Sequence, residues 1–550
     1  MFRLKQIFFA LTRGEKASFF LASGAAVISG FILFTVIFLQ STEAVPASGG
    51  DYTEGLIGQP SLVNPVLASS EVDKALVRLV FANAYDIAEK IEPSPDGRIW
   101  KIRLKENLTW QDGEKMTSDD IVFTVQKIQD PQSSSPLANA WQGIAAQRLS
   151  EIELQLSLVN PYAFFPEILG GLYIVPKHIF EEIPPANWRL SDYNVKPIGS
   201  GPYKFLSFEK RSTGFIATYR LTAWEENFSD MALIQDLNFR FFTNTSDLVQ
   251  SFNSGQIDAL SGISPDTLQA IERSYETVSF RLPNYYAVFL NQSKNIALKE
   301  KVVRNALETL INRDWIVGNA LAGYGEVARG PIPQEATYFD AKLENNSTSS
   351  LESVSAELDA AGWKMNDKGF REKTIQKTKI PLEFTLKLPN IDFLVKTADI
   401  LKAEWEKAGI KINLEVVDSG DAISEAIKGR DYEALLFGNV LNRSLDLFSF
   451  WHSSERFHPG LNVALYNNKK ADALIESIRQ NIDEASRREE FLALQKIIAD
   501  DLPAIFLYSP YYIYVSNKNV RGLEAMLISE PAERFTGAEK WYLRTARVLR

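Results

Sequence analysis

The sequence contains no cysteine and only three histidines in 550 residues. The lack of cysteine excludes disulfides, thiol catalysis, cysteine-ligated zinc and iron–sulfur clusters. It also excludes a lipid anchor attached to an N-terminal cysteine. Basic residues are outnumbered, because 59 Lys and Arg against 69 Asp and Glu give a net charge of −10. Without a basic stripe, the chain is not expected to bind nucleic acid.

Catalytic and metal-binding patterns are also scarce. The stretch from His452 to His458 has acidic and histidine residues three apart, but Pro459 ends any helix there, so we expect a polar loop rather than a metal site. Ser200 lies between glycines without the G-x-S-x-G pattern, and Pro202 would block the helix that follows a nucleophile elbow. A glycosidase needs two convergent carboxylates, which leave no sequence pattern, so this kind of enzyme stays open. We expect no enzyme and no cofactor.

Only one long uncharged run occurs, near the N-terminus. Residues 17–39 carry no charge, and a helix of that length can cross a bilayer core of about 30 Å. The basic segment 1–16 predicts a cytoplasmic N-terminus, with the rest of a single-pass cell-membrane protein outside. Signal peptides have a shorter apolar core of about 7–15 residues, so we favour an uncleaved anchor, with cleavage after Ala47 as the alternative. Residues 40–50 are predicted to be a polar tether.

Local patterns predict a hairpin and a capped helix in the first quarter of the chain. Apolar and charged residues alternate over 100–104, which is typical of a half-buried strand. Residues 108–111 are predicted to form the second strand, closed by an Asp-Gly turn. Thr117 and Asp120 form a capping box that opens a helix over 120–129.

Strand and helix patterns alternate through the rest of the chain. Residues 380–388 read as a strand, 393–407 as a helix and 410–417 as a strand, which together predict a parallel βαβ unit. Such alternation predicts an α/β architecture.

A series of motifs in fixed order resembles the family 5 extracellular solute-binding proteins, the dipeptide and oligopeptide receptors of bacterial ABC importers. The strand–turn–helix of 100–129 has the family's form. Similar motifs occur, in the family's order, at residues 60–65, 199–203, 254–258, 303–307, 356–363 and 466–468. Each motif alone is also a turn or a cap, so the resemblance rests on their joint order.

The resemblance implies an α/β, two-lobed fold of the type II periplasmic-binding-protein kind, with an extra inserted domain and one preceding transmembrane helix. Domain I would comprise residues 51–79, 199–283 and 511–550, domain II residues 80–198, and domain III residues 284–510. Chain crossings near Pro283 and Pro510 would form a hinge, about which the lobes close on a ligand.

In peptide-binding members of this family, a segment after a strand of domain III pairs with the peptide backbone, and its aspartate neutralises the α-ammonium. The matching segment contains Gly438, Asn439, Val440, Asn442 and Asp446. Asn442 replaces the usual aspartate and cannot neutralise an ammonium in a closed cleft. Either Asp446 takes that role, or the ligand lacks a free α-amine there. Arg443 either favours an anionic group or is solvated in a turn.

Three more residues are candidates for the ligand site by position. They are Gln59, Tyr286 and Tyr508. Tyrosines combine contact area with a hydroxyl, which suits both a ligand wall and a protein core. The implied partners are a peptide or other small solute and the permease subunits of an ABC transporter, and we expect a monomer. The alternatives are a sensory or docking ectodomain without transport, and a binder of a nickel chelate, haem or sugar.

Overall fold

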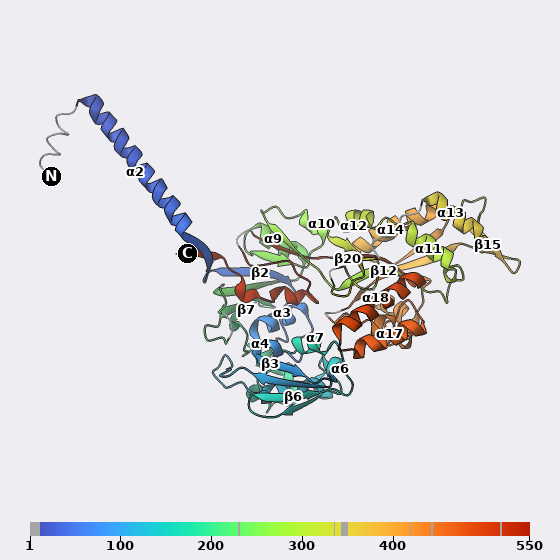
Figure 1. The fold of residues 1–550 in the computed structure, drawn as a ribbon, viewed down its shortest axis with the longest axis horizontal. Helices are drawn as coiled ribbons and strands as arrows, with labels where there is room; N and C mark the ends of the chain where they lie inside the picture. The colour runs from blue at the N-terminus through green and yellow to red at the C-terminus, as the bar shows by residue number, and fades with distance from the viewer. Residues whose placement is uncertain are drawn as a thin grey trace.

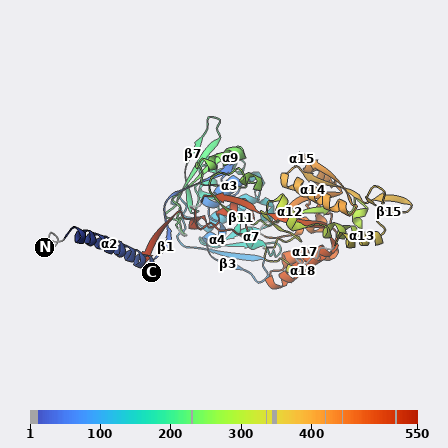
Figure 2. The same ribbon diagram turned by 90° about the horizontal axis from the view of Figure 1, so that it is seen from above.

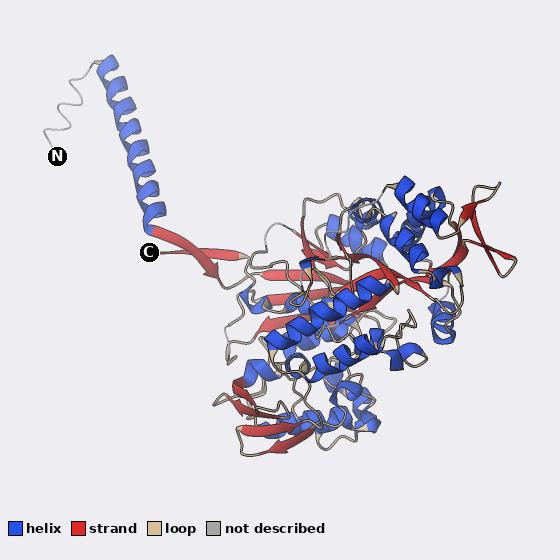
Figure 3. Cartoon of the chain, turned by 45° about the vertical axis from the view of Figure 1, so that its right-hand side comes forward, coloured by secondary structure: helices blue, strands red, loops and turns tan. Residues whose placement is uncertain are grey.

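The structure, a computed structural model, describes residues 12–228, 231–334, 336–342, 350–418, 420–441, 444–517 and 520–549. One long helix, α2 (Arg13–Ser41), projects from the body of the molecule, and the C-terminus lies at its base (Figure 1). Helices and sheets mix throughout the body, which confirms the predicted α/β class (Figure 3).

The residues predicted to form domain I contain a sheet whose strands, among the described residues, follow the order β11-β21-β10-β2-β9-β8-β7. They are β2 (Asp51–Ile57), β7 (Tyr203–Lys210), β8 (Ile216–Ala223), β9 (Asp236–Phe242), β10 (Ala259–Ser261), β11 (Glu276–Phe280) and β21 (Tyr512–Ser516). Its helices are α3 (Glu71–Val80), α9 (Thr245–Asn253) and α10 (Pro265–Leu268). Strand β2 runs parallel to both of its neighbours, β9 and β10.

A buried ion pair fastens the C-terminal segment to this sheet. Arg534 Nη2 lies 2.7 Å from Glu54 Oε1, and both side chains are fully buried. The hydroxyls of Tyr514 and Ser261 donate hydrogen bonds to the same carboxylate at 2.9 and 3.1 Å. Burial acts to lower the pKa of Arg534, but the charge of Glu54, together with Glu71 and the neighbouring tyrosines, holds that pKa above its usual value. Each charge at this depth therefore depends on the other.

Domain II contains a smaller antiparallel sheet in the order β3-β4-β6-β5. Its strands are β3 (Ala88–Pro93), β4 (Ile99–Leu104), β5 (Ala145–Arg148) and β6 (Glu153–Ser157), and its helices are α4 (Ala84–Ile87), α5 (Ser118–Gln129), α6 (Ala138–Trp141), α7 (Phe165–Gly170) and α8 (Lys177–Phe180). The capping box of Thr117 and Asp120 at the start of α5 is confirmed. The strand predicted over 108–111 is wrong, because β3 and β6 occupy both edges of β4 and leave only a single bridge between Thr109 and Lys115.

Domain III has the sheet order β13-β20-β12-β19-β17-β18. Its strands are β12 (Asn284–Leu290), β13 (Gly325–Val327), β17 (Glu383–Pro389), β18 (Lys411–Val417), β19 (Ala434–Val440) and β20 (Ala504–Pro510), beside the small sheet of β14 (Lys364–Met365), β15 (Arg371–Ile375) and β16 (Thr378–Pro381). Its helices are α11 (Lys301–Thr309), α12 (Arg313–Ala320), α13 (Leu351–Ala360), α14 (Asp392–Lys407), α15 (Gly420–Gly429), α16 (Phe448–Trp451), α17 (Lys469–Gln480) and α18 (Glu484–Asp501). The parallel pairing of β17 with β18 around α14 confirms the predicted βαβ unit.

The chain passes between the sheets of domains I and III where β11 leads into β12 and where β20 leads into β21. The strands of each large sheet fall within one of the three predicted domain ranges. The domain boundaries and the hinge at these crossings stay predictions.

The predicted tether over 40–50 is wrong, because most of it is a strand. Strand β1 (Thr42–Ala47) pairs antiparallel with β22 (Arg544–Leu549) along its whole length, and we call this pair the ribbon (Figure 2). Arg547 donates to Thr42 Oγ1 at 2.8 Å and to the carbonyl of Leu39 at 3.2 Å. Its guanidinium carbon lies 5.7 Å from the ring centre of Phe38. The ribbon therefore joins the C-terminus to the last turn of α2.

Candidate ligand-binding site

A cavity of about 520 Å³ is lined by residues from all three predicted domain ranges. Its wall includes Trp141, Tyr162 and Glu167 from domain II, Val440 and Asp446 from domain III, and Glu533 from domain I. A second cavity of about 290 Å³ adjoins it, because Tyr162 lines both, and Arg479 lines the second. We call the two together the cleft. Ligand sites commonly measure about 300–1,000 Å³, so the cleft is large enough to hold a small ligand.

Two carboxylates that line the larger cavity, Glu530 and Glu533, are paired with cations of helix α3. Lys74 Nζ lies 2.6 Å from Glu530, and Arg78 Nη2 lies 3.4 Å from Glu533. These two carboxylates line the larger cavity, but each is matched by a cation from the same domain. Their net contribution to the charge of the cleft is therefore small.

Three side chains meet where domain II touches domain III. Tyr162 Oη donates to Asp446 Oδ2 at 2.8 Å, and Arg479 Nε donates to the same oxygen at 3.0 Å. We call Tyr162, Asp446 and Arg479 the clasp. Burial, and after it the charge of Asp446, raises the pKa of Tyr162, so the phenol stays protonated and can donate. The clasp therefore links the two lobes by a charge-assisted hydrogen bond.

Packing around Arg479 fixes the clasp in place. Its guanidinium carbon lies 4.4 Å from the ring centre of Phe448 and 5.4 Å from that of Tyr162. Its backbone carbonyl accepts a hydrogen bond from the amide of Ala163 at 2.7 Å. Phe164, although it belongs to domain II, is buried in a hydrophobic cluster of domain III. Residues 162–164, which lie in the range predicted for domain II, thus insert into the lobe formed by domain III.

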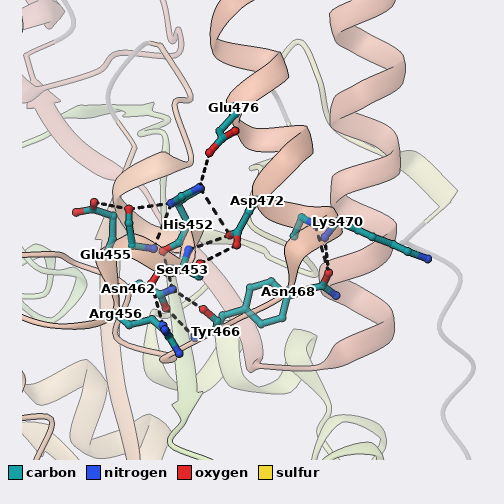
Figure 4. Close-up of polar contacts among 12 residues, drawn as sticks. His452, Ser453, Glu455, Arg456, Asn462, Tyr466, Asn468, Lys470, Asp472 and Glu476 are labelled. Carbon is teal, nitrogen blue, oxygen red and sulfur yellow. Dashed lines mark hydrogen bonds and ion pairs between the residues drawn. The ribbon is translucent and has the colours of Figure 1, made fainter.

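The loop around His452 supports the same region (Figure 4). His452 Nε2 lies 3.2 Å from Glu476 Oε1, and Ser453 donates its amide and its hydroxyl to Asp472 at 2.9 and 2.7 Å. The imidazole also stacks on Phe448, with ring centres 4.4 Å apart. These contacts fasten the loop to α17, the helix that carries Arg479. Within the described residues, no group of three or more His, Cys, Asp or Glu side chains is arranged to hold a metal ion.

Two of the predicted site residues, Val440 and Asp446, line the cleft. Asn439 does not, because successive residues of a strand point to opposite faces. Its Nδ2 donates to the hydroxyl of Tyr285 at 2.8 Å inside the domain III core. Asn442 lies outside the described residues.

The other predicted site residues lie away from the walls of both cavities. Tyr508 is fully buried and its hydroxyl is 2.8 Å from that of Thr397. Tyr286 stacks on Tyr508 with ring centres 5.8 Å apart, and Gly438 packs closely against the ring of Tyr286. Gln59 is exposed and accepts a hydrogen bond from the amide of Ile216 at 2.8 Å. The ligand-binding role of all eight predicted residues stays a prediction.

Sequence reasoning missed Tyr162 and Arg479. Tyr162 lies in a loop of domain II, and Arg479 lies in the last turn of α17 in domain III. No local pattern joins two positions so far apart in the chain. Only the packing of the lobes brings both to Asp446.

Comparisons of the sequence and of the structure with known proteins find the same kind of protein, extracellular solute-binding proteins. Residues 83–456 match the sequence profile of the bacterial extracellular solute-binding proteins, family 5 (middle region). The oligopeptide-binding protein AppA of Bacillus subtilis is 24% identical over 90% of this chain and 92% of its own. Its structure in complex with a nonapeptide, at 25% identity, has a TM-score of 0.65 over 91% of this chain and 100% of that one.

Two further solved structures have the same fold. The ABC transporter substrate binding protein CtaP of Listeria monocytogenes is 24% identical and has a TM-score of 0.76 over 90% of this chain and 99% of that one. NikZ of Campylobacter jejuni, solved in complex with Ni(L-His), is 24% identical and has a TM-score of 0.68 over the same shares of the two chains. These likenesses confirm the predicted fold class.

Proposed function

This chain belongs to the bacterial extracellular solute-binding proteins of family 5, and we propose that it is a membrane-anchored receptor that captures peptides in its cleft and delivers them to an ABC importer permease. The observation that carries the proposal is the cleft itself, which is lined by all three domains. A ligand bound there would contact both lobes and so favour their closed arrangement. The peptide class is supported by AppA, a relative that covers nearly the whole chain and is named an oligopeptide-binding protein.

The end of β19 offers a place for a peptide backbone. Among the described residues, β19 pairs with β17 only at Ala434 and Leu435, whereas its pairing with β12 continues to Val440. The last residues of β19 therefore have a strand partner on one side only. An extended peptide could add to this edge through main-chain hydrogen bonds. Val440, more than half exposed and part of the cleft wall, marks where that edge reaches the cavity.

Helix α2 fits the role of an uncleaved anchor. It has 29 residues, none of them buried, and would span about 43 Å, which exceeds the bilayer core of about 30 Å. The ribbon supports retention of this segment. Cleavage after Ala47 would remove β1, the strand with which β22 pairs. Family 5 proteins act outside the cytoplasm, so the anchor would hold the body at the outer face of the cell membrane.

A thermal-shift experiment tests the ligand class. The full chain in detergent micelles would be mixed with pools of random peptides of two to nine residues, with nickel–histidine, and with glycine as a control. A ligand at about 100 times its Kd stabilises the folded state by about 2.7 kcal/mol, so a peptide pool should raise the Tm clearly. A rise with nickel–histidine alone would assign the cleft to a non-peptide solute. Binding of peptides without capture of permease subunits in a pull-down would favour a sensory or docking role.

A further inference from the structure

The carboxylate of Asp446 lines the larger cavity, but its hydrogen-bonding positions are already largely filled. Oδ2 accepts from both Tyr162 Oη and Arg479 Nε. Oδ1 accepts from the amide of Phe448, at the start of α16. A carboxylate has about four lone-pair positions, so these three bonds leave about one. The charge of Asp446 is also balanced by Arg479 at 3.0 Å.

Arg479 is held so that it cannot easily release Asp446. Its side chain is only about one-third exposed, and the rings of Phe448 and Tyr162 pack against the guanidinium. The hydrogen bond from Ala163 to its carbonyl fixes the backbone of the same residue. A ligand ammonium that approached Asp446 would have to displace this guanidinium or lie close to it. Either outcome is unfavourable, since like charges in a partly buried site repel.

We propose that Arg479 determines the charge preference of the cleft at the clasp, by keeping ligand ammonium groups away from Asp446. The ligand then presents a neutral or anionic group at this point, such as an amide, an acyl oxygen or a carboxylate. In the described part of the chain, the Nη groups of Arg479 make no hydrogen bond with protein, and the residue lines the smaller cavity. A guanidinium with unused donors recognises carbonyl or carboxylate oxygens. This inference rests on the proposed peptide-binding function.

The test compares two peptide libraries on the full chain in detergent micelles. Both are random pentapeptides of identical composition, one with free amino termini and one N-acetylated. The measured quantity is the ratio of affinities for the two libraries, determined by native mass spectrometry. Wild type is compared with Arg479→Gln, Asp446→Asn and the double variant. A change in lobe closure affects both libraries on a given protein equally, so the ratio reports the charge preference alone.

The proposal gives a defined result for each protein. Wild type should bind the acetylated library at least as well as the free one, and Asp446→Asn should not raise the relative affinity for free amino termini, because the charge of Arg479 is then unbalanced. Arg479→Gln should raise the relative affinity for free amino termini by about tenfold or more, the effect of one charge-assisted hydrogen bond. The double variant should return to the wild-type ratio. Arg220→Gln, an exposed arginine of β8, is the matched control and should change nothing.

Two results would overturn the proposal while leaving peptide binding intact. One is a wild-type preference for free amino termini that Asp446→Asn abolishes, which would make Asp446 the ammonium site. This comparison needs no arginine variant and stands even if Arg479→Gln does not fold. The other is a folded Arg479→Gln variant with an unchanged ratio. If neither library binds any of the proteins, the proposed function fails, and the inference fails with it.

Discussion

Removal of one hydroxyl at the clasp should loosen the contact between the lobes. Tyr162→Phe deletes the hydrogen bond of 2.8 Å to Asp446 but keeps the aromatic ring beside Arg479. A hydrogen bond to a charged group contributes about 1.5–3 kcal/mol net. Asp446 keeps Arg479 and the amide of Phe448 as partners, so no unpaired charge is left and the lower end of the range applies. About 1.5 kcal/mol corresponds to about a tenfold fall in the ratio of closed to open molecules.

The lack of cysteine makes this shift measurable with spin labels. Lys101→Cys on β4 and Lys496→Cys on α18 are both exposed and lie in opposite lobes. They would be the only thiols in the protein. Pulsed electron–electron double resonance measures the distance between the two spin labels. On the ligand-free chain, the population with the longer distance should be larger in Tyr162→Phe than in the protein without this change. Tyr193→Phe, at a tyrosine that is 39% exposed, is the control. Equal distance distributions in the two variants would refute the role given to the clasp.

Three other predictions concern stability and the anchor. Arg534→Met should lower the free energy of unfolding by about 3–5 kcal/mol, because it leaves the buried carboxylate of Glu54 without its cation. In urea unfolding, the further change Glu54→Leu should restore most of this loss. A loss below about 1 kcal/mol in Arg534→Met would contradict the prediction. Gly199→Ala should lower the Tm strongly, because the added Cβ would lie 1.9 Å from the carbonyl oxygen of Val80. Gly318→Ala, in an open position on α12, should instead raise the stability by up to about 1 kcal/mol. Equal effects of the two changes on the Tm would argue against the close approach at Gly199. Deletion of β22 should make β1 sensitive to proteinase K, because the ribbon pairs β1 with β22, and unchanged resistance would count against the ribbon.

Local patterns predicted the parts of the fold that local forces determine. The capping box of Thr117 and Asp120 joins residues three apart, and the βαβ unit of β17, α14 and β18 is a continuous stretch. The errors arose where a strand depends on distant partners. The second edge of β4 is filled by β6, about 50 residues further along the chain, and β1 pairs with a strand at the other end of the chain. A sequence pattern shows that a segment favours a strand but not which edge it joins.

The candidate site was predictable only in outline. Motif order placed the end of β19 near the cleft, and Val440 and Asp446 do line it. Three consecutive residues of a strand cannot all face one cavity, which is why Asn439 turns into the core. The clasp could not be predicted, because Tyr162 and Arg479 meet only through packing between domains.

The most direct test of peptide capture is to identify what the protein carries when it is isolated. The full chain would be extracted from host membranes in detergent and analysed by native mass spectrometry, then denatured so that the ligands are released and sequenced. We expect a mixture of peptide masses on a protein that retains residues 42–47. A single non-peptide mass, or a protein that is always empty and binds no added peptide, would contradict the claim that the cleft is a peptide site.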